Sequence, residues 1–438
     1  MSTASAPVGD LASQRESRLQ RVTSVYVVTG LLFMLLPGTF LGVWNLISIT
    51  SQHSLASLSA AWLQAHGHAQ IFGWIGTFVI GIGYYSLSKM GRLAAFAVSR
   101  AWLSWGLWTS GLVLRWIANV NQWQWRVLLP LSAALELAGF LIFFTTVSGH
   151  KSSKAASPRP GIENWMKLVI ASTAGFLGLL LMNLGSAIYL AWQGGGPAIP
   201  HWFDQRFLVL ATWGFPVLAV WGFNARWLPV FLGLQQPFSK GLTAALALCA
   251  SAVVSALCGY LSIAAGLLIA ASATVIYALR LVEPALQPAK TQGIHPSFPV
   301  FVRLCYGWLL TASVLSLWAA RADSNGGIWG ASRHALTVGF LACMIFAIGQ
   351  RVLPAFCGMR QLFSSRLMFA SLLTLNLGCL LRVSSEIPAY EGYSQAAWHV
   401  LPVSAILELI AVSLFAANLV VTLAQPPAHL KHLRQAAA

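Results

Sequence analysis

Three histidines lie within apolar stretches of the sequence, where an imidazole ring has few roles besides hydrogen bonding and metal binding. His66 and His68 occur in HGHAQIFGW, and His334 occurs in RHALTVGF. Aligned on His68 and His334, both stretches have an alanine directly after the histidine and a glycine further along. A matched pair of neutral imidazoles at one depth predicts axial ligation of a haem iron. The alternative is that each ring only hydrogen-bonds a neighbouring helix.

Only one histidine of the HGH pair can face such a pocket, because residues two apart point about 200° apart around a helix. The matched stretches select His68, together with His334, as the pair that binds haem. A third stretch matches the same pattern but carries Val209 instead of a histidine. His66 and His399 are candidate ligands of a second metal such as copper, which imidazole also suits.

Arginines gather at one end of the apolar stretches. Arg115 and Arg382 follow a glycine at the same spacing in matched segments, and Arg333 directly precedes His334. Arginine binds carboxylates in bidentate fashion, so these three side chains are predicted to bind haem propionates. Ordinary contact with lipid headgroups is the alternative.

Two glutamates stand inside apolar segments that also match each other. These are LLPLSAALEL around Glu136 and VLPVSAILEL around Glu408. A carboxylate inside a membrane is costly and marks a functional or architectural position. Each glutamate could relay protons, pair with a partner or fix helix packing, and their repetition favours architecture. The glycines that follow His68 either allow close helix packing or leave room for a flat cofactor.

The composition surrounding these residues is that of a helical membrane protein. Of the 438 residues, 57% are hydrophobic and 8% are charged, whereas soluble domains carry about 25% charged residues. The apolar runs are long enough to cross a bilayer and do not alternate as barrel strands do, so an all-α fold is predicted. About twelve transmembrane helices are expected, near residues 22–49, 64–88, 100–118, 127–148, 166–192, 206–230, 240–258, 261–282, 300–320, 332–354, 366–384 and 398–424.

The matched segments indicate three diverged copies of one four-helix unit, at about residues 20–150, 160–288 and 296–425. Rare residues (His, Arg, Glu and Pro) match in order, which argues against chance similarity. Because four spans are an even number, all three units have the same orientation and are related by rotation about the membrane normal. We therefore predict a single transmembrane domain, residues 1–438, with pseudo-threefold symmetry.

Charge and cysteine content narrow the function further. The net charge of +16 does not predict nucleic-acid binding, because the basic residues lie in short loops and form no patch. They concentrate in the terminal tails and in every second loop, so both termini are predicted to be cytoplasmic. The first apolar run is too long for a signal-peptide core and is expected to remain as the first span. The six cysteines form no Cys-x-x-Cys pair, so any haem is held non-covalently.

Three segments resemble motifs of the NnrS family: HGHAQIFGW, ARWLPVF and HALTVGF…GQRVLPAFCGMR. The resemblance covers most of the chain. It implies a multi-pass protein of the bacterial inner membrane that contains haem b and copper and acts in the response to nitric oxide or in its detoxification. Two positions depart from the family. Gln70 stands where the family tends to carry Glu, and the segment around Cys357 lacks the family's histidine.

The predicted architecture also resembles the catalytic subunit of haem–copper oxidases and nitric oxide reductases. Those proteins bind a low-spin haem through histidines of helices 2 and 10, where His68 and His334 lie. Their copper ligands come from helices 6 and 7, which contain no histidine here as predicted, so turnover at a binuclear centre is not expected. The expected partners are the bilayer, haem and a diatomic gas such as nitric oxide. The alternatives are a metal-free secondary transporter and a degenerate oxidase- or reductase-like subunit.

Overall fold

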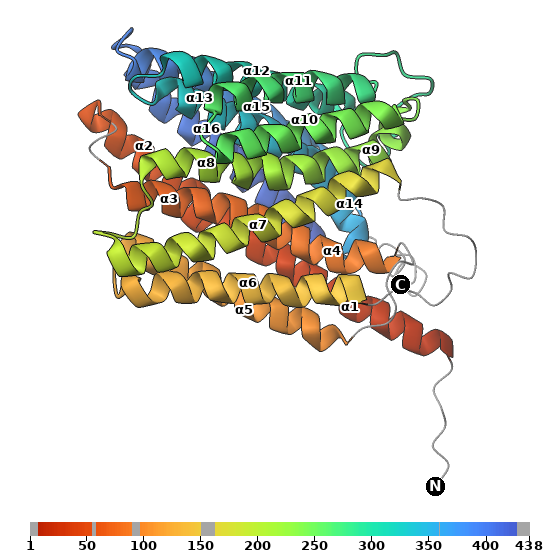
Figure 1. Cartoon of the computed structure of the whole chain (residues 1–438). Helices are drawn as coiled ribbons and strands as arrows, with labels where there is room; N and C mark the ends of the chain where they lie inside the picture. The colour runs from red at the N-terminus through yellow and green to blue at the C-terminus, as the bar shows by residue number, and fades with distance from the viewer. Residues whose placement is uncertain (1–7, 55–57, 90–96, 150–162, 359, 427–438) are drawn as a thin grey trace.

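All regular secondary structure among the described residues is helical in this computed structural model (Figure 1). The structure describes residues 8–54, 58–89, 97–149, 163–358 and 360–426. Part of the basic charge behind the predicted orientation lies outside the described residues, in segments 90–96, 150–162 and 427–438.

The described residues form long helices at all twelve positions predicted from the apolar runs. Seven of these are uninterrupted: α6 (Trp125–Gly149), α7 (Asn164–Gln193), α10 (Ser239–Leu257), α11 (Leu261–Ala278), α12 (Phe298–Ala322), α15 (Ser365–Tyr390) and α16 (Ala397–Ala424). Five contain π-helical turns: α1 (Val8–Phe33), η1 (Met34–Phe40) and α2 (Leu41–Gln52); α3 (Ala60–His68), η3 (Ala69–Gly76) and α4 (Thr77–Lys89); α5 (Val98–Trp116) and η4 (Ile117–Asn121); α8 (His201–Thr212), η5 (Trp213–Val217) and α9 (Leu218–Leu232); and α13 (Gly327–His334), η6 (Ala335–Ala342) and α14 (Cys343–Phe356). Within the described part of the chain, ten helices are long and apolar enough to cross a membrane, which supports a multi-pass membrane protein.

Three of the π-helical segments occupy matching places in the predicted repeat. The segment η3 begins directly after His68, and η6 begins directly after His334. The third, η5, ends at Val217, the position that matches the end of η6. A π turn places an extra residue in a helical turn and is frequent at functional sites. The sequence patterns did not predict these segments.

The helices are arranged as an inner group surrounded by an outer ring. In α8–η5–α9, 78% of the most apolar 18-residue stretch is buried inside the bundle, and in α13–η6–α14 the buried share is 72%. In the other candidate spans this share is 33% to 50%. The most extensive contacts join α5 to α6, α10 to α11 and α15 to α16, the same pair in each predicted repeat. The helix α16 also packs against η1 and α2. This arrangement agrees with the predicted polytopic all-α fold.

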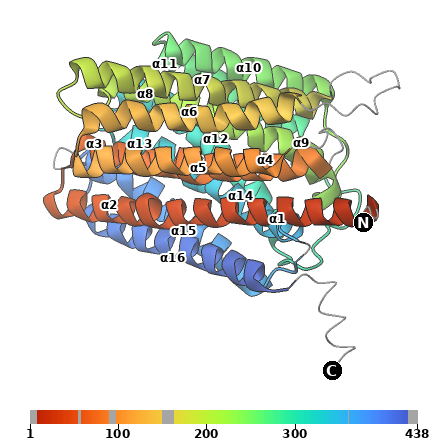
Figure 2. The ribbon, with the colours of Figure 1, turned by 90° about the horizontal axis from the view of Figure 1, so that it is seen from below.

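The described chain begins and ends at the same end of the bundle. Figure 2 shows α1 starting and α16 finishing on one side. An even number of spans produces this arrangement, because each pair of antiparallel helices returns the chain to the side where it began. The histidine-bearing ends of α3 and α13 therefore lie on the same half of the bundle.

The first and third predicted repeats also agree in how closely two of their helices approach each other. A Cβ atom added at Gly111 would lie 2.8 Å from the side chain of Glu136, and one added at Gly378 would lie 2.9 Å from that of Glu408. Each added atom would also come close to a backbone oxygen of the same neighbouring helix, at 2.8 Å and 3.1 Å. The two glycines thus allow α5 to approach α6, and α15 to approach α16, in the same manner.

Candidate functional site

The first polar cluster, which we call the His68 cluster, joins α3, α5, α6 and α7. His68 Nε2 lies 2.8 Å from Glu136 Oε1. The other oxygen of Glu136 accepts a hydrogen bond from Asn183 Nδ2 at 3.1 Å, and Arg115 Nη1 donates to Asn183 Oδ1 at 3.1 Å. Glu136 and Asn183 are completely buried, so the amide of Asn183 stands between the guanidinium and the carboxylate inside the bundle.

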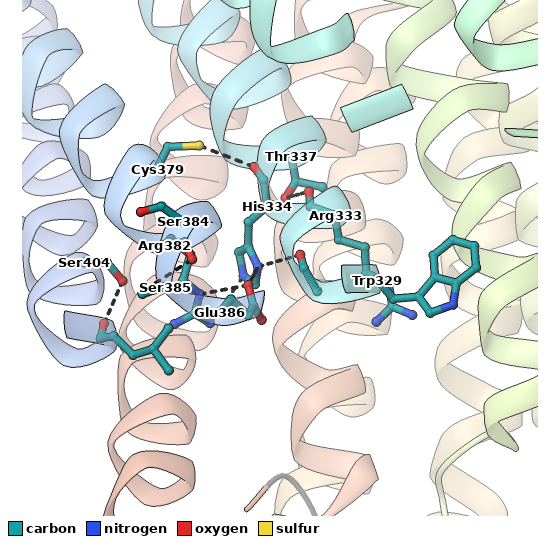
Figure 3. A network of polar contacts seen from close by, with 12 residues as sticks. Trp329, Arg333, His334, Thr337, Cys379, Arg382, Ser384, Ser385, Glu386 and Ser404 are labelled. Atoms are coloured by element: carbon teal, nitrogen blue, oxygen red, sulfur yellow. Dashed lines mark hydrogen bonds and ion pairs between the residues drawn. The ribbon is translucent and has the colours of Figure 1, made fainter. Parts of the chain in front are cut away.

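The second polar cluster, the His334 cluster, joins α13 to α15 (Figure 3). His334 Nδ1 lies 2.8 Å from Glu386 Oε2 and 2.9 Å from the carbonyl oxygen of Gly330. Arg382 Nη2 lies 3.4 Å from His334 Nε2, and Arg382 Nε lies 3.5 Å from Glu386 Oε2. Here the arginine, the histidine and the carboxylate contact one another directly.

His66 lies beside the His334 cluster and not beside His68. Its Nδ1 is 2.8 Å from the carbonyl oxygen of Gly38 in η1. Its ring packs on Gly42, where an added Cβ would lie 2.6 Å from the ring. His334 and Arg382 are among the neighbours of His66. The π-helical part of the first helix therefore holds this histidine facing α13 and α15.

The hydrogen-bond partners determine which nitrogen of each neutral ring carries the proton. Carbonyl and carboxylate oxygens only accept hydrogen bonds, whereas a guanidinium only donates them. His66 and His334 therefore carry hydrogen on Nδ1 and have their lone pair on Nε2. His68 has the opposite tautomer, because its Nε2 donates to Glu136. Two histidines thus share the form that offers Nε2 to a metal, and His68 does not.

The glycines after His68 accommodate aromatic side chains. Added Cβ atoms at Gly73 and Gly76 would lie 2.9 Å from the side chains of Phe33 and Trp108 respectively. A small cavity beside His68 has a volume of about 10 Å³, roughly enough for one water molecule. Of the two interpretations of these glycines, the structure supports close helix packing over a slot for a flat cofactor.

The remaining predicted residues are spread around these clusters. Arg333 leaves α13 on the side opposite Arg382 (Figure 3). Among the described residues, the buried Oε1 atom of Glu408 has no hydrogen-bond partner. His399 is exposed near the start of α16. In the part of the chain that the structure describes, no group of three or more His, Cys, Asp or Glu side chains is placed to hold a metal ion, so a second metal at His66 and His399 stays a prediction.

Three important residues were missed or misplaced by the sequence patterns. Glu386 fell outside the predicted span, which ended at residue 384, whereas α15 continues to Tyr390. Its spacing of four residues from Arg382 on one helix face is the signal that could have found it. Asn183 stood alone in an apolar run, with no matching residue in another repeat to mark it. Helix 6 begins at His201 and not at Arg206, so it does contain a histidine, at its exposed first residue.

A solved structure of a haem–copper terminal oxidase dimer is similar to this chain. The alignment covers 93% of this chain and 84% of that chain, with 12% sequence identity and a TM-score of 0.53. At this identity the likeness shows the fold alone, which is a distant relative of the haem–copper oxidase fold. No curated protein matches the sequence.

The family model that matches is described as a domain of unknown function, DUF8744, and the match covers residues 179–423. This segment contains His334, Arg382 and Glu386, and it begins after His68 and Arg115. It does not confirm the resemblance to NnrS, which stays a prediction. Because the match spans more than half of the sequence, the chain belongs to the DUF8744 family.

Proposed function

We propose that this protein binds one b-type haem through His66 and His334, near the outer face of a bacterial inner membrane. The resemblance to NnrS suggests that the bound haem serves in sensing, binding or detoxifying nitric oxide. The observation that carries the proposal is the shared tautomer of His66 and His334, because each ring fixes its Nδ1 in a hydrogen bond and offers Nε2. Metal-binding histidines are typically oriented by such a hydrogen bond from the other ring nitrogen.

The choice of His66 differs from the expectation based on the matched segments, which paired His68 with His334. His68 donates Nε2 to a fully buried carboxylate, and its ring stacks on Phe72 with 4.1 Å between ring centroids. Releasing that nitrogen would leave Glu136 short of a hydrogen bond inside the bundle, which is costly. His66 has no such competing partner at Nε2 among the described residues.

The surrounding side chains have separate roles in this proposal. Glu386 accepts the Nδ1 hydrogen of His334 and so holds the ring in its coordinating tautomer. Arg382 lies beside Nε2 and would have to leave it, after which its guanidinium is the nearest candidate for a propionate. When bound, haem supplies reversible one-electron chemistry and, where an axial ligand is displaced, a site for a diatomic gas.

Copper, which the resemblance to NnrS also implies, has no comparable support. His201 is the one histidine of α8–η5–α9, and α10 contains none. The oxidase-like fold therefore lacks the histidines that would build a copper centre beside the haem. We restrict the proposal to haem and do not extend it to oxygen or nitric oxide reduction at two metals.

The test is an optical spectrum of the detergent-purified protein from haem-replete cells, oxidised and then reduced with dithionite. We expect a Soret band with reduced b-type features in the wild type, and their loss in His66→Ala and in His334→Ala. His68→Ala is the matched control, because it removes a neighbouring histidine of the same helix and should retain the spectrum.

The variants test haem binding and the identity of the haem ligands separately. A colourless but folded wild-type protein would exclude haem binding and leave the metal-free transporter as the better hypothesis. If the spectrum is lost in His68→Ala and kept in His66→Ala, haem binding stands and the ligand pair reverts to His68 and His334.

A further inference from the structure

Arg115 is a buried cation that lacks a directly bound counter-ion. The residue is 5% exposed, and its one hydrogen bond to a side chain goes to the neutral amide of Asn183. Among the described residues, no carboxylate oxygen lies within 4.0 Å of its guanidinium, and its Nε has no hydrogen-bond partner. The equivalent Arg382, in contrast, pairs directly with Glu386. A buried charge is costly unless it is paired, so the position beside Arg115 calls for an anion.

The small cavity beside His68 lies at this position. Arg115 lines it together with Trp116, whose Nε1 hydrogen also has no partner in the part of the chain that the structure describes. Apart from the ring of His68, the other lining residues are apolar, among them Phe33 and Leu112. Two residues that each carry an N–H donor without a partner among the described residues, one of them cationic, thus line a small space to which no carboxylate or carbonyl side chain contributes.

We propose that this cavity binds one small inorganic monovalent anion, of about the size of a halide. A water molecule would fit the space and accept both hydrogen bonds, but it would leave Arg115 with no anion in direct contact, because its nearest carboxylate, Glu136, lies on the far side of Asn183. A halide accepts from both donors and also neutralises the guanidinium. The space is far too small for a porphyrin, and the site belongs to the His68 cluster, so it is separate from the proposed haem site.

Radioactive chloride provides a direct test. The full-length protein, purified in gluconate buffer, is equilibrated with ³⁶Cl⁻ by dialysis. We expect saturable binding that approaches one chloride per chain, and loss of that binding in Arg115→Gln. Trp116→Phe keeps the aromatic bulk but removes one donor, and we expect about tenfold weaker binding from the loss of one hydrogen bond to a charged ligand. Arg126→Gln, at another arginine on the same side of the membrane, is the control and should bind as the wild type does.

Two results would overturn the proposal. One is the absence of saturable chloride binding in the folded wild type, which would leave a water molecule in the cavity. The other is unchanged affinity in Trp116→Phe, which decides the question even where Arg115→Gln does not fold. The haem-ligand variant His334→Ala keeps the two proposals apart, because it should bind chloride normally. Chloride binding that appears only in this variant would mean that a haem carboxylate occupies the site.

Discussion

The His68 cluster and the His334 cluster each contain a histidine and an arginine at matching positions, yet the carboxylate that holds each histidine comes from a position with no match in the other cluster. In the His68 cluster, the carboxylate that holds the histidine comes from α6, and Asn183 separates it from the arginine. In the His334 cluster, the carboxylate comes from α15 and contacts both the histidine and the arginine. One cluster separates its arginine from the carboxylate by an amide, whereas in the other the two are in direct contact.

The difference originates at one matched position. Glu386 corresponds to Asn119, which donates to the carbonyl oxygens of Ala61 and Pro197 at 3.4 Å and 3.2 Å. With a carboxylate at this position, the His334 cluster no longer needs the glutamate from its fourth helix. Glu408, which matches Glu136, is left with a buried oxygen that has no partner within the described ranges. Repeated side chains therefore do not guarantee repeated partners, because one neighbouring substitution redirects the hydrogen bonds.

The largest effect is expected from Glu386→Gln. The substitution removes the negative charge that pairs with Arg382 and holds His334, while leaving the cation inside the bundle. Breaking a buried pair in this way costs about 3–5 kcal/mol. The thermal unfolding midpoint of the purified protein in detergent should fall further than it does for Gly111→Ala or Gly378→Ala. A midpoint equal to that of the wild type would mean that Arg382 has another counter-ion.

The glycine pair tests the part of the comparison in which the two regions agree. Gly111→Ala and Gly378→Ala each place a methyl group against a glutamate side chain and a backbone oxygen. Overpacking of this kind costs about 1–3 kcal/mol, and we expect similar losses at the two positions. The midpoints of both variants, measured side by side with the wild type, check this. Markedly unequal losses would show that the two helix pairs do not pack alike.

The smallest effect is expected from Glu408→Gln, and its contrast with Glu136→Gln sharpens the comparison. Glu136 accepts from both His68 and Asn183, so neutralising it should cost about 1–3 kcal/mol. Glu408 has a buried oxygen without a partner, so the same change there should cost below about 1 kcal/mol. Unfolding midpoints of the two variants measure the difference. Equal losses would mean that Glu408 has a partner similar to that of Glu136.

The sequence was sufficient for the helices and for the matched residues, since apolar length and rare polar residues are visible along the chain. It was not sufficient to predict which side chains form hydrogen bonds with one another. The choice between His66 and His68 depended on which helix each ring faces, and the π-helical turn in the first helix supplies the carbonyl oxygen that holds His66. Glu386 was missed because the polar end of α15 looks like a loop by hydropathy, although four-residue spacing from Arg382 places both on one face.

The π-helical turns directly after His68 and His334 also constrain how such a chain can change over evolutionary time. Removing one residue from η6 would rotate α13, which carries His334, by about 100° relative to α14. His334 would then turn away from Glu386, although no residue of the cluster had been replaced. Apolar residues within these segments can be exchanged for one another, but their number cannot change. We expect insertions and deletions among family members to fall in the loops and to spare these turns.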